Sequence, residues 1–329
     1  MPVAFERDPH SAALIRRAGE LGIEVQDLGP CWGLDAVRFR AAGRAVLVIE
    51  GAIYPGLSHA VNLICDSKVA CKAALEELGI PTPPGLTLPR GLPGPRVAAQ
   101  IEAFVAAQPG DARFVCKPVV GTNGVGVSMD LSTPAAINRA ALALLAEGDA
   151  LVELQIQGRD LRLHAISGRL VAACVREPAS FLGDGRDTVV AHVARKAAQI
   201  RARNPQNDLV IDAQVLALLA EQGLTPDAIP AAGQVVRLKR VANVAQGGVP
   251  WDVTDSLHPD YAGWMARIAE GTGLSIFALD VMTPDHRAPP AAGAWALEIN
   301  ARPQWLHHTF SEGRQHDIAG MTLRALLGL

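Results

Sequence analysis

The sequence has few aromatic residues and almost no excess of charge. Its 329 residues include 7 Phe, 5 Trp and 2 Tyr, and 30 basic side chains face 33 acidic ones, for a net charge of −3. Without a cluster of Lys and Arg the chain does not attract a polyanion, so we expect no nucleic-acid partner. The longest apolar stretches, such as residues 45–49, are far shorter than the roughly 20 residues that cross a bilayer, and the N-terminus lacks a secretory pattern. The sequence thus predicts a cytoplasmic, enzyme-sized protein without a membrane partner.

Cysteine is scarce and follows no metal-binding or disulfide pattern. The five cysteines are Cys31, Cys65, Cys71, Cys116 and Cys174. No two form a CxxC pair, and an odd number cannot all pair within one chain. We therefore interpret each as a small, buried, apolar side chain in a reducing compartment, which disfavours a cysteine nucleophile or zinc ligand.

Helix and strand patterns occur in a mixed order, which predicts an α+β fold rather than a regularly alternating parallel one. Residues 1–62 read as a short opening unit, with a helix at 9–21 and strands at 23–28 and 45–49. A helix at 66–79 follows, capped by Asp66 and bearing Lys68 and a solvated Lys72 one turn apart. The later segments predict strands at 113–120, 127–131, 151–156, 160–166, 169–175, 235–240, 275–282 and 294–300, and helices at 95–107, 134–147, 187–221 and 259–272.

A hairpin with a glycine-rich tip is the first candidate for binding chemistry. Gly121, Gly124 and Gly126 lie between two predicted strands, and Lys117 precedes them. Glycines permit positive φ and let backbone N–H groups approach an anion, and the lysine adds a mobile charge, so a phosphate group fits this tip. The segment is neither a P-loop nor a dinucleotide-binding fingerprint. An ordinary hairpin turn is the alternative interpretation.

Asp280, Glu298 and Asn300 form the second candidate. Glu298 and Asn300 lie two residues apart on one predicted strand and share a face, while Asp280 lies on the strand candidate before it. Mg²⁺ prefers hard oxygen ligands, with one or two carboxylates completed by substrate phosphates. A solvated strand face is the alternative.

In their order along the chain, these motifs resemble those of ATP-grasp carboxylate–amine ligases. The residues that carry the resemblance, over 63–329, are Lys68, Lys117 with its glycine-rich loop, Glu153, Asp160, Arg162, Arg176, Gly183-Asp184-Gly185, Arg240, Asn243, Gly247-Gly248, Asp280, Glu298 and Asn300. The pattern is similar to the ATP-grasp modules of cyanophycin synthetase and of bifunctional glutathione synthetase, and more distantly to the ribosomal-protein glutamate ligase. The resemblance implies two α+β subdomains that grip ATP: a lid at 63–150 and a C-terminal subdomain with the metal site at 151–329, after a shortened N-terminal α/β domain at 1–62.

The resemblance also implies which residues bind ATP. Lys68 and Lys117 would contact the phosphates, and the loop 121–126 would close over them as a lid. The segment that begins at Glu153 would hold adenine, and Asp160 would take the ribose hydroxyls. The full set is Lys68, Lys117, Gly121, Thr122, Asn123, Gly124, Val125, Gly126, Glu153, Leu154, Gln155, Ile156 and Asp160.

Metal, catalytic and substrate residues follow in the same way. Asp280, Glu298 and Asn300 would bind two Mg²⁺ ions. The implied catalytic residues, which would steady an acyl-phosphate and the tetrahedral intermediate, are Arg176, Arg240 and Asn243. The implied substrate contacts are Arg162, Arg302, Ser311 and Gly313, with a structural ion pair as the alternative for Arg302. For His307, His308 and His316 we favour surface or substrate-loop positions over a metal site, because adjacent histidines on an extended chain point to opposite faces.

The predicted activity is the ATP- and Mg²⁺-dependent joining of an amino acid or small peptide carboxylate to an amine through an acyl-phosphate, with release of ADP and phosphate. Val241, Ala245 and Gln246 depart from the pattern of the two similar modules, so the substrates stay open. A stand-alone glutathione synthetase and a non-catalytic nucleotide-binding regulatory module are the alternatives. The 329 residues hold neither a glutamate–cysteine ligase region nor a Mur-ligase-like region, which disfavours a polymer synthase. We expect small-molecule partners and leave a homodimer open.

Overall fold

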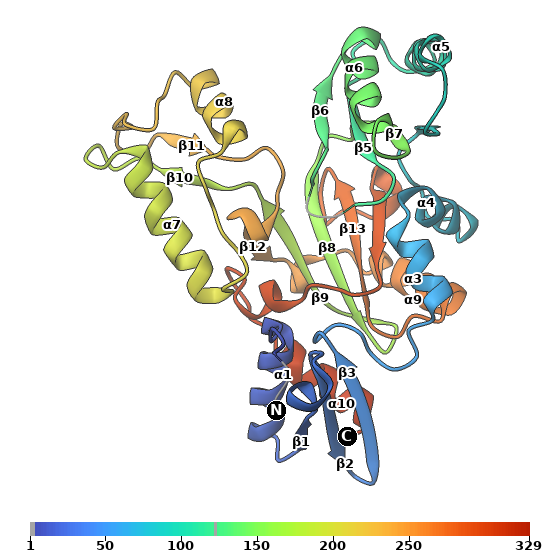
Figure 1. Ribbon diagram of the computed structural model, residues 1–329, viewed down its shortest axis with the longest axis vertical. Coiled ribbons are helices and arrows are strands. Elements are labelled where there is room, and N and C mark those ends of the chain that lie inside the picture. The colour runs from blue at the N-terminus through green and yellow to red at the C-terminus, as the bar shows by residue number, and fades with distance from the viewer. Residues whose placement is uncertain (1–3, 122–123) are drawn as a thin grey trace.

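The computed structural model describes residues 4–121 and 124–329 as a mixed α and β protein (Figure 1). In this part of the chain every strand ladder is antiparallel, so the predicted α+β class is confirmed. The strands form four sheets, each of which belongs to a distinct part of the molecule. None of the helices in the described residues is both long and apolar enough to span a bilayer.

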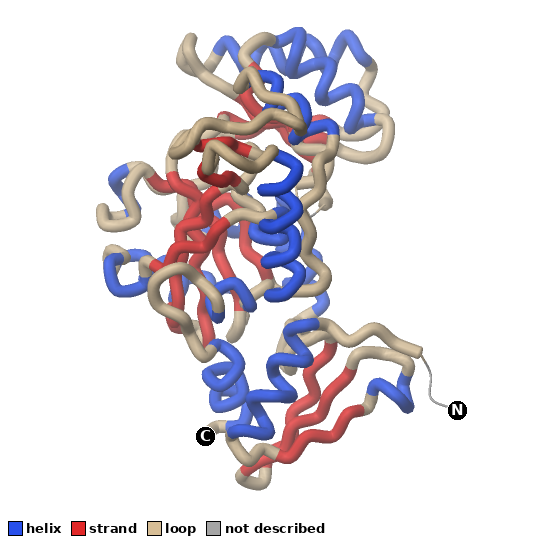
Figure 2. The backbone as a smooth tube through the Cα atoms, turned by 90° about the vertical axis from the view of Figure 1, so that its left-hand side faces the viewer, coloured by secondary structure: helices blue, strands red, loops and turns tan. Residues whose placement is uncertain are grey.

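The opening unit is a three-stranded sheet with one long helix. Helix α1 (Pro9–Glu20) is followed by β1 (Glu24–Asp27), the short α2 (Gly29–Trp32), β2 (Ala36–Ala41) and β3 (Arg44–Ile49). Asp8 begins α1, because its side chain accepts a hydrogen bond from the His10 N–H and Pro9 supplies a helical φ at the first position. The unit shares its apolar core with α10 (Ile318–Leu327), which lies beside α1 (Figure 2).

The predicted hairpin with the glycine-rich tip belongs to a four-stranded sheet. The order is β4 (Gly85–Leu88), β7 (Ala150–Leu154), β5 (Phe114–Pro118) and β6 (Ser128–Leu131). Helices α5 (Gly94–Ala106) and α6 (Pro134–Leu145) share an apolar core with it. Because β7 pairs with both β4 and β5, this sheet continues to Leu154, beyond the predicted domain border at residue 150.

The largest sheet lies at the centre of the molecule. Its order is β12 (Val249–Asp252), β9 (Arg169–Glu177), β8 (Arg159–Ile166), β13 (Phe277–Thr283) and β14 (Trp295–Asn300). Three helices share its core: α3 (His59–Asp66), α4 (Lys68–Glu77) and α9 (Asp260–Thr272). Residues 63–77, predicted as part of the lid, therefore pack on this central sheet instead. Ser67, not Asp66, caps α4: its hydroxyl accepts from the Ala70 N–H at 3.3 Å.

The four-stranded sheet and its helices form a first lobe, and a second lobe stands apart from it (Figure 1). It contains β10 (Ser180–Leu182), α7 (Val189–Arg203), α8 (Ala213–Glu221) and β11 (Val235–Arg237), around an apolar core of its own. The single helical stretch predicted at 187–221 is wrong, because α7 ends before Pro205 and the chain is irregular until Asp212 caps α8.

Candidate functional site

A buried carboxylate on β7 holds two lysines. Glu153 is 3% exposed, and its carboxylate pairs with Lys72 Nζ at 2.7 Å and with Lys117 Nζ. Lys72 also donates to the carbonyl of Pro83. The interpretation of Lys72 as a solvated residue is therefore wrong, and its partnership with Glu153 joins α4 to the four-stranded sheet. Each Glu153 oxygen thus has a lysine partner before any nucleotide binds.

Lys68 lies at the entrance to the glycine-rich loop. Its ammonium donates to the Gly121 carbonyl at 2.7 Å, and its backbone N–H donates to the Val119 carbonyl at 3.0 Å. Burial lowers the pKa of Lys68, the nearby Glu298 carboxylate opposes this change, and the positive charge of Lys117 adds to it. The structure thus brings both predicted phosphate lysines into one electrostatic neighbourhood with a predicted metal ligand.

The tip of the hairpin is exposed backbone with positive φ. Gly124 and Gly126 have φ of 72° and 74°, and Val125 is 73% exposed. The predictions for Thr122 and Asn123 fall on positions outside the described residues. A chain that must turn through these angles favours glycine, as predicted.

The predicted adenine segment after β7 is already partly hydrogen-bonded. The N–H groups of Leu154 and Gln155 donate to the carbonyls of Pro84 and Arg113, at 2.9 and 2.7 Å. The Gln155 side chain makes two hydrogen bonds with Asp130 of β6. These contacts hold the segment, which continues to Ile156, against the four-stranded sheet.

The three predicted metal ligands converge on two adjacent strands. Asp280 of β13 is directly opposite Glu298 of β14, and Asn300 is opposite Ala278, two residues along the same face. Burial and then the negative charge of Asp280 raise the pKa of Glu298. The buried Nδ2 atom of Asn300 has no hydrogen-bond partner among the described residues. Hard oxygen donors and a carboxyl group destabilised by a like charge fit a divalent cation such as Mg²⁺, whereas the Asn300 N–H group can only donate, for example to a phosphate oxygen.

Two arginines neutralise Asp280 from the neighbouring strands. Arg162 of β8 is 2.7 Å from its Oδ1 atom, and Arg176 of β9 is 3.2 Å from Oδ2. Burial alone would raise the pKa of Asp280, but these two ion pairs lower it to about 2. Arg176 also donates to Asp160 at 2.8 Å, so the predicted ribose ligand and the predicted catalytic arginine form one network.

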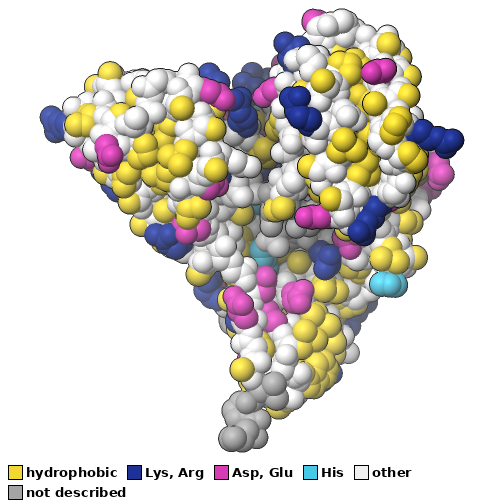
Figure 3. All heavy atoms as spheres, turned by 45° about the horizontal axis from the view of Figure 1, so that its top comes forward, with side chains coloured by type: hydrophobic (Ala, Val, Ile, Leu, Met, Phe, Trp, Pro, Cys, Tyr) yellow, Lys and Arg dark blue, Asp and Glu magenta, His cyan; other side chains and the backbone are white. Residues whose placement is uncertain are grey.

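The other two predicted catalytic residues lie near the second lobe. Arg240, just after β11, forms an ion pair with Glu221 of α8 and a second, at 3.4 Å, with Asp130 of the four-stranded sheet. It therefore spans the hollow between the two lobes that Figure 3 shows. Asn243 caps the turn η1 (Val244–Gln246) by accepting from the Ala245 N–H at 2.9 Å.

The predicted substrate contacts follow the metal strand and mostly have partners within the chain. Arg302 is 3.3 Å from Asp66 at the end of α3, which is the structural ion pair considered as the alternative. Ser311 is buried and donates to the His307 carbonyl at 3.0 Å, whereas Gly313 is exposed. His307 and His308 are buried on the short helix η4 (Leu306–Thr309), so a surface position is wrong for both.

Comparison with solved structures identifies the architecture. A bifunctional glutathione synthetase from Pasteurella multocida superposes on 98% of this chain, and on 44% of its own, with a TM-score of 0.71 and 22% sequence identity. This chain has the ATP-grasp fold. The ATP-grasp resemblance of the sequence and the predicted fold are thereby confirmed.

Curated sequences give the same relationship for part of their length. Cyanophycin synthetase of Crocosphaera subtropica is 31% identical over 277 residues, which cover 81% of this chain and 31% of that protein. The bifunctional glutathione biosynthesis protein GshAB of Mannheimia succiniciproducens is 29% identical over 267 residues, 77% of this chain and 34% of that protein. This ATP-grasp chain thus spans about a third of the length of these relatives, which are ligases. No protein-family model matches it.

Proposed function

We propose that this chain is an ATP- and Mg²⁺-dependent ligase that joins the carboxylate of an amino acid or small peptide to an amine. The observation that carries the proposal is the cross-strand pair Asp280 and Glu298 with Lys68 and Lys117 in the same electrostatic neighbourhood. Phosphoryl transfer depends mainly on positioning and charge neutralisation, and these residue types supply both. The ligase relatives support the same reaction class.

The donor set of Asp280, Glu298 and Asn300 fits Mg²⁺, which would neutralise phosphate charge and polarise the transferred group when bound. Lys68 and Lys117 would hold the ATP phosphates. The backbone of the glycine-rich loop would lie over them and exclude water from an acyl-phosphate.

Two arginines are candidates to stabilise charge on the reacting carboxylate. Arg176 is fixed between Asp160 and Asp280, so its guanidinium is preorganised. Arg240 is half-exposed and has carboxylate partners on both sides of the hollow. We propose that Arg176 steadies the phosphorylated carboxylate and that Arg240, with Asn243, completes the site when the lobes close on substrate.

A substrate screen tests the proposal directly. The purified chain is incubated with ATP, Mg²⁺ and pairs of amino acids or dipeptides, and ADP, AMP and phosphate are measured. We expect ADP and phosphate that depend on both a free carboxylate and a free amine. Hydroxylamine in place of the amine should trap the acyl-phosphate as a hydroxamate. AMP with pyrophosphate, or a stable acyl-enzyme, contradicts the mechanism.

Glutathione synthetase activity is the second candidate. It is favoured by the superposition of nearly the whole chain on a bifunctional glutathione synthetase. The same assay with γ-glutamylcysteine and glycine decides between the two: ADP release that depends on this pair alone supports glutathione synthesis. Val241, Ala245 and Gln246, which replace polar residues of the similar modules, lead us to expect a different pair.

A further inference from the structure

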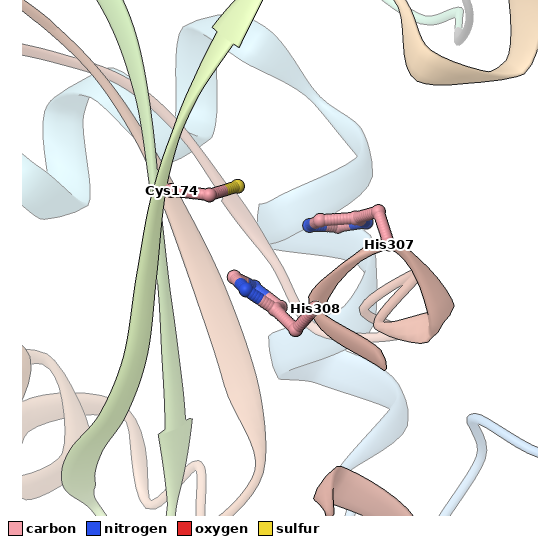
Figure 4. Close-up of side chains that lie close together, drawn as sticks. All are labelled: Cys174, His307 and His308. Carbon is pink, nitrogen blue, oxygen red and sulfur yellow. The ribbon is translucent and has the colours of Figure 1, made fainter. Parts of the chain in front are cut away.

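A cluster of soft metal ligands lies beside the proposed nucleotide site. Cys174 of β9 points toward His307 and His308 of η4, and one ligand atom from each lies within 4.8 Å of the others (Figure 4). All three side chains are buried: Cys174 and His308 are fully enclosed and His307 is 7% exposed. Three ligands from two elements far apart in the sequence are thus preassembled around one point.

The histidines of this cluster have an unusual number of orphaned nitrogens. Nε2 of His307, both ring nitrogens of His308 and both of the neighbouring His164 are buried without a hydrogen-bond partner among the described residues. His164, on β8, lies with its ring centroid 5.6 Å from that of His308. Buried polar atoms are nearly always satisfied, and each unsatisfied one costs free energy of desolvation. Five such atoms together offer lone pairs and N–H groups that a bound group could satisfy.

The protonation states suit a metal and not a nucleophile. Burial lowers the pKa of His307 and of His308 well below the ordinary value, and that of His164 to about 3, so the rings are neutral and their lone pairs are available. Burial raises the pKa of the Cys174 thiol to about 12. A thiol in this state is inert unless a metal takes the place of its proton.

We infer that Cys174, His307 and His308 bind one Zn²⁺ ion, with His164 at hand as the fourth ligand. Thiolate and imidazole donors select zinc over Mg²⁺, which requires oxygen ligands, so this site is chemically distinct from Asp280, Glu298 and Asn300. The enclosure of all four side chains indicates a structural rather than a catalytic zinc. Binding replaces the thiol proton, which leaves to solvent, by a sulfur–zinc bond.

The charged groups that act on His307 are themselves ion-paired. Arg162 pairs with Asp280, and Arg176 pairs with both Asp160 and Asp280, so each positive charge near the cluster has a carboxylate beside it. A bound zinc ion would connect η4 to β9 at Cys174, two residues before Arg176. It would therefore fix the segment that follows the proposed Mg²⁺ ligand Asn300.

Cobalt substitution tests the inference without reference to activity. Tag-free, chelator-treated protein is titrated with Co²⁺ in saturating Mg²⁺, which occupies the oxygen-donor site. We expect about one equivalent of bound Co²⁺ with a sulfur-to-cobalt charge-transfer band, displaced by Zn²⁺. In Cys174→Ala the band should be absent, and it should persist in Cys31→Ala, which removes an exposed thiol. No band in the wild type, or a band that follows Cys31, overturns the inference.

A second variant covers the case in which Cys174→Ala fails to fold. His308→Gln keeps the Cys174 thiol and removes one imidazole ligand. The loss of this ligand should weaken the affinity for Co²⁺ on the order of 10-fold or more, since even the loss of a group that only hydrogen-bonds to a metal ligand costs that much. Thermal unfolding of the wild type should shift upward with Zn²⁺ and return on chelation. Unchanged Co²⁺ affinity in folded His308→Gln, or no thermal shift in the wild type, contradicts the site.

Discussion

Asp280 and Glu298, the two carboxylates of the proposed metal site, affect the stability of the fold in opposite ways. Asp280 is held by Arg162 and Arg176, which lower its pKa to about 2, whereas Glu298 is buried beside it with a raised pKa. Removal of Asp280 leaves the buried guanidinium of Arg162 without its carboxylate partner and leaves Arg176 with Asp160 alone. Removal of the Glu298 charge relieves a repulsion instead. The two residues are thus distinguishable by stability even if both are essential for turnover.

The first prediction contrasts variants of these two residues. Glu298→Gln should lower turnover on the order of 10²-fold or more, because the proposed Mg²⁺ site loses an anionic ligand, with little change in stability. Asp280→Ala should lose turnover and also about 3–5 kcal/mol of unfolding free energy, the typical cost of breaking a buried ion pair. Urea unfolding and ADP release measure both quantities. Near-wild-type turnover of Glu298→Gln in saturating Mg²⁺ would rule out its place in the metal site.

Among the helices and strands, the sequence predicted those whose position depends on residues close together in the chain. The helix predicted at 9–21 is α1, and the glycine run between two apolar stretches predicted the β5–β6 hairpin. The sequence did not predict β2, β4, β12 or the three-residue strand β10. Strand β10 pairs across more than fifty residues with β11, which lies within the strand predicted at 235–240. Tertiary contacts decide such short strands, and a single sequence does not show those contacts.

In the candidate site, too, the sequence predicted some features and missed others. The sequence placed Asp280 and Glu298 on neighbouring strand candidates, and the structure adds that they lie directly opposite each other. The partnership of Lys72 with Glu153 joins residues 81 positions apart and had no local signal. The expectation for His307 and His308 failed because it assumed extended chain. On the 3₁₀-helix η4, with three residues per turn, adjacent side chains are about 120° apart and both can face inward.

The second prediction concerns the glycine-rich loop. Gly124→Val places a β-branched residue at φ of 72° and should cost roughly 1–2 kcal/mol. It should slow turnover several-fold beyond any effect of stability, because the stiffer side chain would hinder the proposed closure of the loop over the phosphates. Gly91→Val is the matched control: its φ is 85°, its surroundings are equally open, and it lies outside the site. Equal turnover losses in the two variants would remove the evidence for a lid.

At the scale of the whole molecule, the first and last helices are joined by one side chain. Asp317 caps α10 by accepting from the Gly320 N–H at 2.9 Å, and it receives hydrogen bonds from Arg17 of α1 at 3.0 and 2.7 Å. Burial opposes ionisation, but Arg17 and the capped N–H lower the pKa of Asp317. The helix cap and the contact between the two ends of the chain therefore depend on the same carboxylate.

The third prediction separates these roles. Asp317→Ala should cost roughly 1–2 kcal/mol, about 1 from the cap and at most about 1 from the half-exposed ion pair. Asp317→Asn keeps a good cap and should lose only the second part. Because the folded-state pKa is depressed, the ion-pair part is present above the unfolded pKa of about 3.9 and disappears as the pH falls through the folded value. Urea unfolding of the three proteins at pH 7 and pH 3 measures this; an Asn variant as unstable as the Ala variant contradicts it.

The common core of α1, the three-stranded sheet and α10 also determines when the protein can complete its fold. The ribosome releases the apolar face of residues 9–49 early, but its partners on α10 emerge some 270 residues later, on the order of tens of seconds at ordinary synthesis rates. During that interval Leu14 and Phe39, fully buried in the finished protein, have no permanent cover. The final core of the opening unit therefore cannot form until almost the whole chain has been synthesised.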